Sequence, residues 1–486
     1  MPRRLLILFI VFWGVMVIRL DSTWDGIQER VWIAAAVRNY TLYDFQDIGF
    51  MVTRNAAPTN PDNLSFYTSH PPLNVWLPAI LTKFFGYNEL AIRYGFAAVT
   101  MLSAAAMYVI ARRLYGERIA FWATLFYVVT PFVAYFGRMP GHDLLGMLAA
   151  LLYTAVIINW LRKPTQVRFI ALIALTWLAV WTAWPAVFFI AVIGIVAMWQ
   201  GKAYHKKRVV ILGISTILAF VTLLVFYQLQ WDGSLERLLD KYEYRTSNVS
   251  GRQGSEPFTI IEYIMQNVGH VIYLGTPGLL ALSVWGIFIL RKRGGNHAIL
   301  IGLFIAGLLY QLAFRNASFI HSYYKVFLVP AMALSAAFVV VYSRRGRWKR
   351  PAVDGLIFSM IIVSASLIFI MHLGDSQPWI FDIVNEFEAE STPDDILATS
   401  FYDTKHNEVI MFYLFRQVQW IQTPEEALEL ANETQQRVMY VYCVDIPVTE
   451  RVPIFPNIFD DMASYESEAF LEDRCHLFKV TPDEIQ

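Results

Sequence analysis

Three acidic side chains follow the first apolar segment of the chain, at Asp21, Asp25 and Glu29. A carboxylate fixed in a site can take the proton from a hydroxyl group as a general base. Asp25 and Glu29 are four residues apart, so they would share one face if the helix expected over 27–40 begins early. The alternative is structural, with Asp25 as the helix N-cap and Glu29 in the first turn.

A second polar stretch, 137–143, holds Arg138 and Asp143 on either side of a Pro-Gly turn. Charged side chains at the depth of apolar helices are costly, and they often mark a site. Here the acid could position or deprotonate a hydroxyl, and the guanidinium could neutralise a phosphate. The alternative is that Asp143 caps the next helix and that Arg138 extends its charge to the membrane surface.

Two further stretches carry residues suited to binding an anion. His70 precedes Pro71 and Pro72, which fix a rigid extended turn. This histidine could bond a ligand, or the turn could serve only to start a helix. Tyr324 and Lys325 end a basic and aromatic stretch at a helix start, where they could hold a phosphate group. The alternative for the tyrosines is the aromatic belt of a membrane helix.

The composition places these residues in a membrane protein. Of the 486 residues, 56% are hydrophobic and 16% are charged, whereas a soluble domain has about a quarter charged residues. The mean hydropathy is +0.44. The formal net charge is zero, so nothing in it indicates a nucleic-acid partner. No Cys or His spacing of a metal site is present, and no cluster of Asp residues indicates a metal.

Apolar runs predict about 11 transmembrane helices, because a span needs about 20 apolar residues and fewer where the bilayer is thin. Residues 1–20 resemble a signal peptide, but no small-residue cleavage site follows Leu20, so we expect a retained first helix. The runs lie at 5–20, 90–111, 119–136, 144–160, 169–182, 186–199, 209–227, 275–290, 298–314, 324–342 and 353–371.

The cations alternate along this series of spans. Lys and Arg mark cytoplasmic connections, and six groups of them fall on one side if the spans are correct. This predicts a multi-pass protein of the cell membrane with a cytoplasmic N-terminus. The polar stretches 21–89 and 137–143 and the C-terminal segment then lie outside. The six groups are at 3–4, 112–118, 162–168, 202–208, 291–293 and 344–350.

Three apolar segments read better as interfacial helices in the outside loops than as spans. They lie at 27–40, 73–85 and 257–271, and counting either of the last two as a span would break the alternation of charge. We therefore divide the chain into a transmembrane catalytic domain, 1–372, with a first outside loop at 21–89, and an extracytoplasmic domain, 373–486.

The C-terminal domain is expected to be a small α/β fold. Thr423 should cap a helix that begins with Pro424 and two acids. Cys443 and Cys475 either form a disulfide, which an extracytoplasmic location permits, or are two separate buried thiols. A helix is expected at 381–390, and strands are expected at 396–399, 408–410, 417–421 and 438–443.

Taken in order, these motifs resemble those of the integral-membrane GT-C glycosyltransferases of the protein mannosyltransferase and aminoarabinose transferase kind. The resemblance covers about the first third of the chain. It is carried by the Ala-rich segment 34–39 that ends in Arg38-Asn39, by His70-Pro71-Pro72-Leu73, by Phe85-Gly86, by Arg93 and segment 111–118, and by the loop with Arg138 and Asp143.

The resemblance implies an essential acid in the first outside loop. It is commonly an Asp-Glu pair ten and nine residues before the Asn of the Arg-Asn segment. Counting back from Asn39 gives Glu29 at the acid position and Arg30 in place of the second acid, with Asp25 one turn earlier as the alternative. Asp143 matches the acid of the second outside loop.

The implied activity is transfer of a sugar from a polyprenyl-phosphate donor in the bilayer to a glycan, lipid or protein hydroxyl. A single displacement would invert the anomeric carbon, and we expect no metal and no cofactor besides the donor. The expected roles are general base for Glu29 or Asp25, acceptor positioning or a share in proton transfer for Asp143, phosphate neutralisation for Arg138 and Lys325, and assistance from His70 and Tyr324.

Two other classes of function fit a chain of this composition. A multi-pass transporter or flippase of a lipid-linked or small substrate would place charges near the membrane midplane and would show paired repeats, neither of which is visible. A membrane scaffold that binds partners through its C-terminal domain would need neither Glu29 nor Asp143 for its function.

Overall fold

The fold comes from a computed structural model, which describes residues 3–18, 31–54, 64–250, 256–293, 297–343, 349–374, 379–400, 404–421, 423–443, 467–470 and 475–482. The chain forms two compact units. Unit 1 comprises residues 1–21, 49–52 and 67–373, and unit 2 comprises 22–48, 53–66 and 374–486. The domain division made from the sequence, 1–372 and 373–486, stays a prediction.

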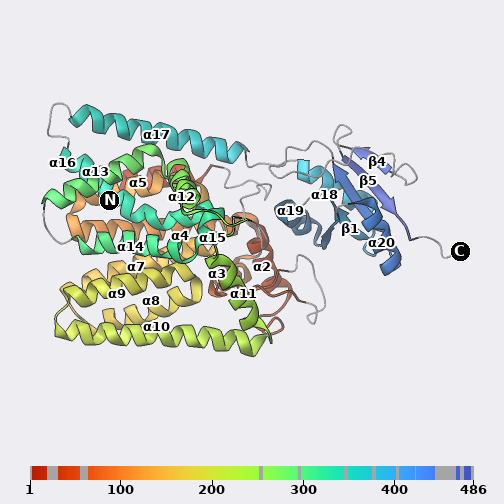
Figure 1. The fold of residues 1–486 in the computed structure, drawn as a ribbon, viewed down its shortest axis with the longest axis horizontal. Helices are drawn as coiled ribbons and strands as arrows, with labels where there is room; N and C mark the ends of the chain where they lie inside the picture. Colours follow the sequence, from red (N-terminus) through yellow and green to blue (C-terminus); the bar gives the residue numbers. More distant parts are fainter. Residues whose placement is uncertain are drawn as a thin grey trace. The chain divides into compact units, whose positions relative to one another are not determined.

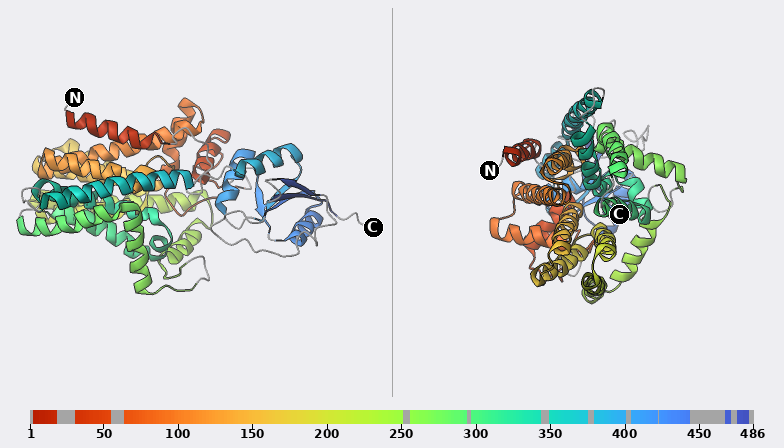
Figure 2. Two further views of the ribbon diagram at one scale, coloured as in Figure 1. Left: turned by 90° about the horizontal axis from the view of Figure 1, so that it is seen from above. Right: turned by 90° about the vertical axis from the view of Figure 1, so that its left-hand side faces the viewer.

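Unit 1 is helical, and its helices pack side by side around a continuous apolar core (Figures 1 and 2). In chain order its elements are α1 (Arg3–Met16), α3 (Leu73–Phe85), α4 (Glu89–Tyr115), α5 (Glu117–Val129), α6 (Pro131–Phe136), α7 (His142–Arg162), α8 (Gln166–Thr182), α9 (Trp184–Gln200), α10 (Ala203–Gln230), α11 (Ser234–Thr246), α12 (Ile260–Gly275), α13 (Pro277–Arg293), α14 (Ala298–Ala313), α15 (Arg315–Ile320), the 3₁₀ helix η2 (Ser322–Leu328), α16 (Val329–Ser343) and α17 (Lys349–Gly374).

The chain is a polytopic membrane protein, and its spans are less regular than the sequence pattern predicts. Among the described residues, five helices are long and apolar enough to cross a membrane, or six if the bent pair α12 and α13 is one span. Shorter apolar helices include α8, α9 and α14. The expected run 119–136 is divided at Thr130 and Pro131 into α5 and α6. The count of eleven spans therefore stays a prediction.

In the described parts of the chain, helices form at the segments expected to be interfacial, and their position at the interface stays a prediction. The predicted range 73–85 is helix α3. Helix α12 is capped at Thr259, whose hydroxyl accepts from the Glu262 N–H at 3.2 Å. It meets α13 at an angle of 106°. At the bend Thr276 has a φ of +69°, and its hydroxyl accepts from the Leu279 N–H and so starts α13.

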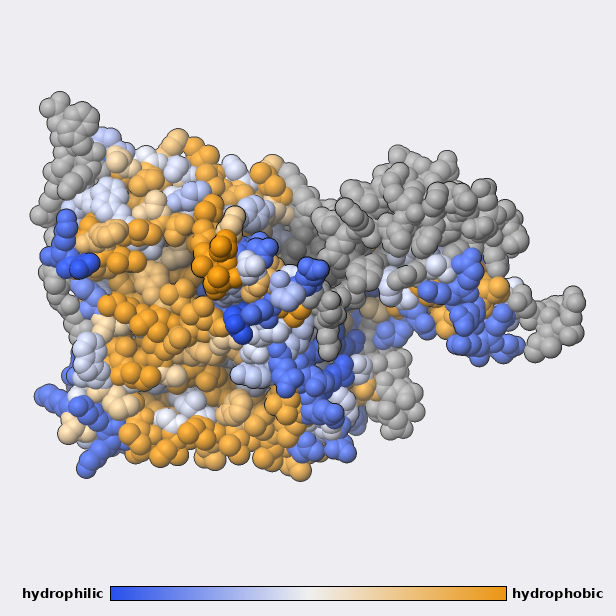
Figure 3. All heavy atoms as spheres, in the orientation of Figure 1, coloured by the Kyte–Doolittle hydropathy of each residue, from blue (hydrophilic) through white to orange (hydrophobic). Residues whose placement is uncertain are grey.

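Figure 3 shows the consequence for the surface of unit 1. On the face drawn there, the flanks of the helices are covered by apolar residues, and hydrophilic residues gather at the left-hand end. The exposed large hydrophobic side chains of α10 are Tyr204, Val210, Ile211, Ile214, Ile217, Leu218, Phe220, Val221, Val225 and Leu229. In water such a surface would drive aggregation, whereas in a bilayer it matches the hydrocarbon.

Unit 2 contains a five-stranded sheet with the order β2-β1-β3-β5-β4. Strand β1 pairs in parallel with β2 and β3, and β5 pairs antiparallel with β3 and β4. The elements of the unit are α2 (Val31–Leu42), α18 (Trp379–Glu390), β1 (Ile396–Thr399), α19 (Thr404–Leu414), β2 (Val418–Trp420), α20 (Pro424–Thr434), β3 (Val438–Cys443), β4 (Ser467–Phe470) and β5 (Cys475–Val480).

Local sequence signals set most of these boundaries. Thr423 caps α20 by accepting from the Glu426 N–H at 3.3 Å, as its position before Pro424 predicts.

The expected strand at 408–410 is wrong, because these residues lie inside helix α19. A short apolar run does not distinguish a strand from a buried helix turn. Here Asn407 is held by a 2.6 Å bond with Thr399, and α19 packs against α2 and α18.

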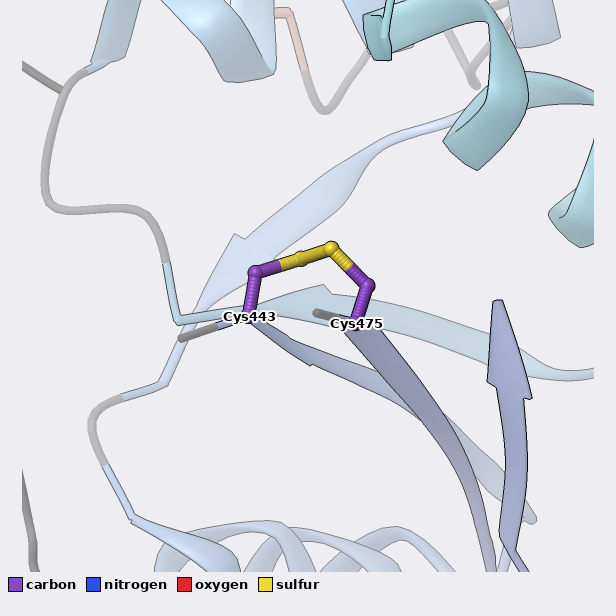
Figure 4. Close-up of a disulfide and its surroundings, with 2 residues drawn as sticks. All are labelled: Cys443 and Cys475. Carbon is purple, nitrogen blue, oxygen red and sulfur yellow. A yellow bond between two sulfur atoms is a disulfide. The ribbon is translucent and has the colours of Figure 1, made fainter. Parts of the chain in front are cut away.

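The two cysteines of the chain are bridged. Cys443 ends β3 and Cys475 begins β5, and the register places them directly opposite each other (Figure 4). This selects the disulfide over the alternative of two separate thiols. The bridge closes the connection between two antiparallel strands, with a sequence separation of 32 residues.

Candidate functional site

A cavity of about 410 Å³ lies in unit 1 between α9, α10, α11 and the end of α14. Aromatic and aliphatic side chains form most of its wall, and they come from helices whose exposed faces are apolar. Its polar groups are few and converge from separate segments, which is the usual composition of a small-molecule site. They are Ser69, His70, Lys241, Tyr242, Arg245, Tyr310 and Tyr324.

Hydrogen bonds to its own carbonyl group and to that of the preceding residue hold His70 in this wall. Its carbonyl oxygen accepts from the Tyr227 hydroxyl at 2.8 Å, and the Ser69 carbonyl accepts from the Trp184 indole at 2.8 Å. The imidazole Nδ1 lies 2.6 Å from the Tyr67 hydroxyl, and the two rings are stacked. The His70 turn therefore joins α9 and α10, and helix α3 starts directly after it.

Tyr324 belongs to an aromatic cluster in the wall of the same cavity. Its ring centroid is 5.2 Å from that of Tyr310 and 4.5 Å from that of Tyr323. Its side chain is 3% exposed. Several rings packed in this way fix one another's orientation, because each pair has a preferred geometry. The cluster thus presents a rigid surface to the cavity, with the hydroxyls as its polar part.

Two cations line the cavity, the exposed Lys241 and the half-buried Arg245. The Arg245 guanidinium lies 3.2 Å from Nε2 of His321 and donates to the Asn316 side chain at 3.4 Å. Burial by itself lowers the pKa of Arg245, but the surrounding tyrosines, Tyr324 foremost, outweigh it and raise this pKa above its ordinary value. An arginine side chain is positively charged at physiological pH, so Arg245 can pair with an anion in this mostly apolar wall.

Arg245 is not among the residues that the sequence motifs indicate, because the stretch 228–256 carries no recognisable motif. The signal that could have found it is the helical spacing of Leu238, Tyr242 and Arg245, which places the three on one face of α11. All three line the cavity. Lys241 of the same helix also lines the cavity, so the face combines apolar side chains with two cations, as a surface for an anion with a hydrocarbon tail would.

Asp143 lies in the first turn of α7 and is 3% exposed. The alternative that it caps this helix is wrong, because the N-cap is Gly141 and no side chain caps the turn. A carboxylate in this position is stabilised by the N-terminal end of the helix dipole. Asp143 does not line the cavity, but it is near enough to Tyr310 and Tyr324 to act on them electrostatically.

Arg138 and Lys325 are both buried in unit 1, with side chains 1% and 0% exposed, and neither lines the cavity. Lys325 donates to the carbonyl oxygen of Ser318, which holds η2 against α15. Among the residues expected from the sequence, the structure thus places His70 and Tyr324 in the wall of one cavity. Asp25 and Glu29 lie outside the described residues.

Arg38 and Asn39, which contribute to the resemblance, have structural contacts within unit 2. The Arg38 guanidinium donates to the Phe412 carbonyl and stacks over the Phe415 ring at 3.6 Å from its centroid. Asn39 donates to the Thr53 hydroxyl at 2.8 Å. These contacts join α2 to α19 and to the strand-like segment at Thr53.

Comparisons with known proteins agree with this picture. The family described as Dolichyl-phosphate-mannose-protein mannosyltransferase matches residues 69–227. This range contains both the His70 turn and Tyr227, whose hydroxyl donates to the His70 carbonyl. A relative from Proteus mirabilis, undecaprenyl phosphate-alpha-4-amino-4-deoxy-L-arabinose arabinosyl transferase 2, is 27% identical over 330 residues. The match covers 64% of this chain and only 57% of that relative's length.

Solved structures share the fold over nearly the whole chain. ArnT from Cupriavidus metallidurans, bound to undecaprenyl phosphate, has a TM-score of 0.63 at 14% identity and covers 98% of this chain and 97% of its own. Archaeal oligosaccharyltransferase AglB from Archaeoglobus fulgidus has a TM-score of 0.57 at 11% identity, covering 91% of this chain and 69% of its own. These findings confirm the resemblance to the GT-C membrane glycosyltransferases of the protein mannosyltransferase and ArnT kind, whose fold this chain has.

Proposed function

We propose that this protein is a glycosyltransferase that moves a sugar from a polyprenyl-phosphate donor to an acceptor hydroxyl on the outer side of the membrane. The observation that supports the proposal is the cavity, whose wall is mostly apolar and carries the cations Arg245, which is half-buried, and Lys241, which is exposed. A prenyl chain fits the apolar part and its phosphate fits the guanidinium. The names of the relatives support the donor class, since two of them refer to undecaprenyl phosphate.

The residues of the cavity have separate roles in this proposal. Arg245 binds the donor phosphate and stabilises the charge that develops on it as the sugar departs. His70 and Tyr324, which line the same cavity, add hydrogen bonds. Arg138 and Lys325 stay in the proposal as buried cations of the same unit, whose field favours an anionic leaving group.

The reaction is a single displacement. The acceptor oxygen forms a bond to the anomeric carbon while the bond from that carbon to the phosphate oxygen breaks, through an oxocarbenium-like state. A carboxylate, Glu29 or Asp25, takes the proton of the acceptor hydroxyl, and Asp143 positions that hydroxyl or shares the proton transfer. Polyprenyl phosphate leaves, and the anomeric configuration is inverted.

The test is incubation of the purified protein in lipid with a panel of radiolabelled polyprenyl-phosphate sugars. Wild type should release polyprenyl phosphate, and Glu29→Gln and Asp143→Asn should lower the rate by two or more orders of magnitude, roughly the contribution of a positioned acid or base. Asp240→Asn is the matched control, because Asp240 is exposed on α11 and does not line the cavity. Normal turnover by both site variants would refute the assignment.

Metal independence is a separate part of the proposal. The cations named above supply the positive charge that a divalent metal would otherwise provide at the phosphate. Activity should therefore persist in EDTA. Loss of activity in EDTA with recovery on adding a divalent metal would contradict this.

The rival class of function predicts a different result in the same membranes. A transporter or flippase would move labelled substrate into sealed vesicles without transferring the sugar. Accumulation of intact donor inside the vesicles, with no release of polyprenyl phosphate across the panel, would favour that class over the transferase.

A further inference from the structure

A second cavity lies at the opposite end of unit 1. Helix α7 starts beside the first cavity and ends at Arg162 after 21 residues, which corresponds to about 30 Å. Helix α9 likewise runs from Trp184, in the wall of the first cavity, to Gln200, in the wall of the second. The second cavity has a volume of about 390 Å³ and is lined by Leu114, Tyr115, Ile158, Leu161, Arg162, Gln200, His297 and Ile299.

Half of this lining is polar and can bind an anion. The Tyr115 hydroxyl lies 3.3 Å from Nδ1 of His297, so the two side chains form one hydrogen-bonding unit. The Arg162 guanidinium donates one N–H to the Arg113 carbonyl. A guanidinium has five N–H donors in a fork that matches a phosphate, so others can serve a ligand in the cavity.

The other half of the lining is aliphatic, from Leu114, Ile158, Leu161 and Ile299. If a small soluble anion bound here, these side chains would stay exposed to water. The first methylene groups of an acyl chain would cover them instead. The cavity also lies at the ends of helices with apolar outer faces, where the headgroups of a bilayer lie. The mixed lining therefore fits an anion that carries hydrocarbon.

The charge of the surroundings selects an anionic ligand. In sequence, the connections 112–118, 162–168, 201–208 and 291–297 hold many Lys and Arg residues and one acid, Glu117. Glu117 lies 3.5 Å from Arg4 and is compensated by it. The uncompensated positive charge would attract an anionic lipid surface over about a Debye length, and a basic pocket between helices would hold one headgroup.

We propose that this second cavity is a binding site for the phosphodiester headgroup of an anionic phospholipid. Arg162 and His297 bind the phosphate, Tyr115 orients His297, and the aliphatic half contacts the upper part of the acyl chains. The site is one helix length from the donor cavity, so the inference does not depend on glycosyl transfer.

The experiment is native mass spectrometry of the delipidated full-length protein, titrated with phosphatidylglycerol or phosphatidylcholine of identical acyl chains. Wild type should bind one phosphatidylglycerol about tenfold or more tightly than phosphatidylcholine, and Arg162→Gln should lose about that factor, as expected for one charge-assisted hydrogen bond. His297→Gln should also weaken binding, and it keeps the test valid if Arg162→Gln does not fold.

Lys206→Gln is the matched control, because Lys206 is an exposed cation at the same end that does not line the cavity. Its affinity for phosphatidylglycerol should stay within about twofold of wild type. Equal affinity of wild type for the two lipids, or an equal loss in Lys206→Gln, would overturn the site. Displacement of the lipid by millimolar inorganic phosphate would show a free-phosphate site instead and would also overturn the proposal.

Discussion

At the scale of single residues, the value of a charged side chain depends on what surrounds it. Arg245 is the last polar member of an apolar helix face, and the tyrosines beside it favour its charged form. Arg237 lies two turns earlier on the same helix, but it is exposed and faces the Trp231 ring. An arginine at position 245 can thus bind an anion in the cavity, whereas the arginine at position 237 is a solvent-exposed surface residue.

We expect Arg245→Gln to raise KM for the polyprenyl-phosphate donor and to lower kcat/KM by about tenfold or more. One charge-assisted hydrogen bond to the phosphate contributes about 1.5–3 kcal/mol, and each 1.4 kcal/mol is a factor of ten. Steady-state kinetics with varied donor measures this. Arg237→Gln is the control, and the same loss in both variants would mean that the effect comes from the charge of α11 and not from the cavity.

A residue of unit 2 gives a pH dependence of stability. Asp395, whose side chain is 6% exposed, accepts from Arg437 at 2.8 and 2.6 Å, one bond to each carboxylate oxygen. Burial raises the pKa of Asp395, but the bonds from Arg437 and the Thr392 N–H outweigh it and hold this pKa below its usual value. The ion pair therefore stabilises the folded state above the unfolded pKa, and this contribution is lost as the pH falls through the folded pKa.

Asp395→Asn should therefore lower the stability of the β1–β3 region by about 1–3 kcal/mol at neutral pH, the cost of leaving a buried partner unpaired. The difference from wild type should shrink as the pH falls below the usual range of an aspartate. Hydrogen exchange of the β1 and β3 amides in the full-length protein measures both quantities. A difference that grows in acid would contradict the sign worked out here.

At the scale of elements, close helix packing in unit 1 depends on small side chains. Gly286 of α13 is buried against the backbone of Ser335 in α16, and a methyl group at Gly286 would overlap the Ser335 carbonyl. One turn away, the hydroxyls of Ser283 and Ser335 lie 2.8 Å apart. Small residues and interhelical hydroxyl bonds are the usual means of joining helices in a membrane, where hydrophobic burial between helices adds little.

Gly286→Ala should therefore destabilise unit 1 by about 1–3 kcal/mol, the usual cost of overpacking a core. Gly213→Ala on α10 is the matched control, because nothing lies within 4 Å of the added methyl group. Thermal unfolding of both variants in the same detergent compares them. If the two unfold at the same temperature, the helices α13 and α16 can move apart without cost.

At the scale of the whole molecule, the distribution of charge sets the topology. The cationic connections lie at the ends of helices opposite the donor cavity, and the positive-inside rule places them in the cytoplasm. The same reasoning puts α11 and the donor cavity outside. The sidedness stays a prediction, because the fold by itself is compatible with either orientation in the membrane.

Single cysteines introduced at Lys206 and Lys241 test this topology. Both native cysteines are bridged and should not react under non-reducing conditions. A membrane-impermeant maleimide added to intact cells should label the variant Lys241→Cys and leave Lys206→Cys unlabelled until the membrane is opened. The reverse pattern would invert the topology and would move the proposed reaction to the cytoplasmic side.

The sequence by itself determined the elements that depend on short-range physics. Apolar runs of bilayer length, the Pro71-Pro72 start of α3, the Thr423 cap and the strands β1 and β3 all follow from neighbours within a few residues. The order of the polar motifs also suffices for the resemblance, and the sequence predicts His70, Tyr324 and Asp143 as site residues.

Only the tertiary structure decided which side chains share a cavity and which short apolar runs form a helix where the sequence predicts a strand. Arg245 reaches His321 and Asn316 across more than seventy residues, so no local pattern contains that contact. Residues 408–410 are helical because α19 packs against α2 and α18, which outweighs the weak preference of a short apolar run. Membrane spans and caps are encoded locally, whereas a binding cavity is the sum of long-range contacts.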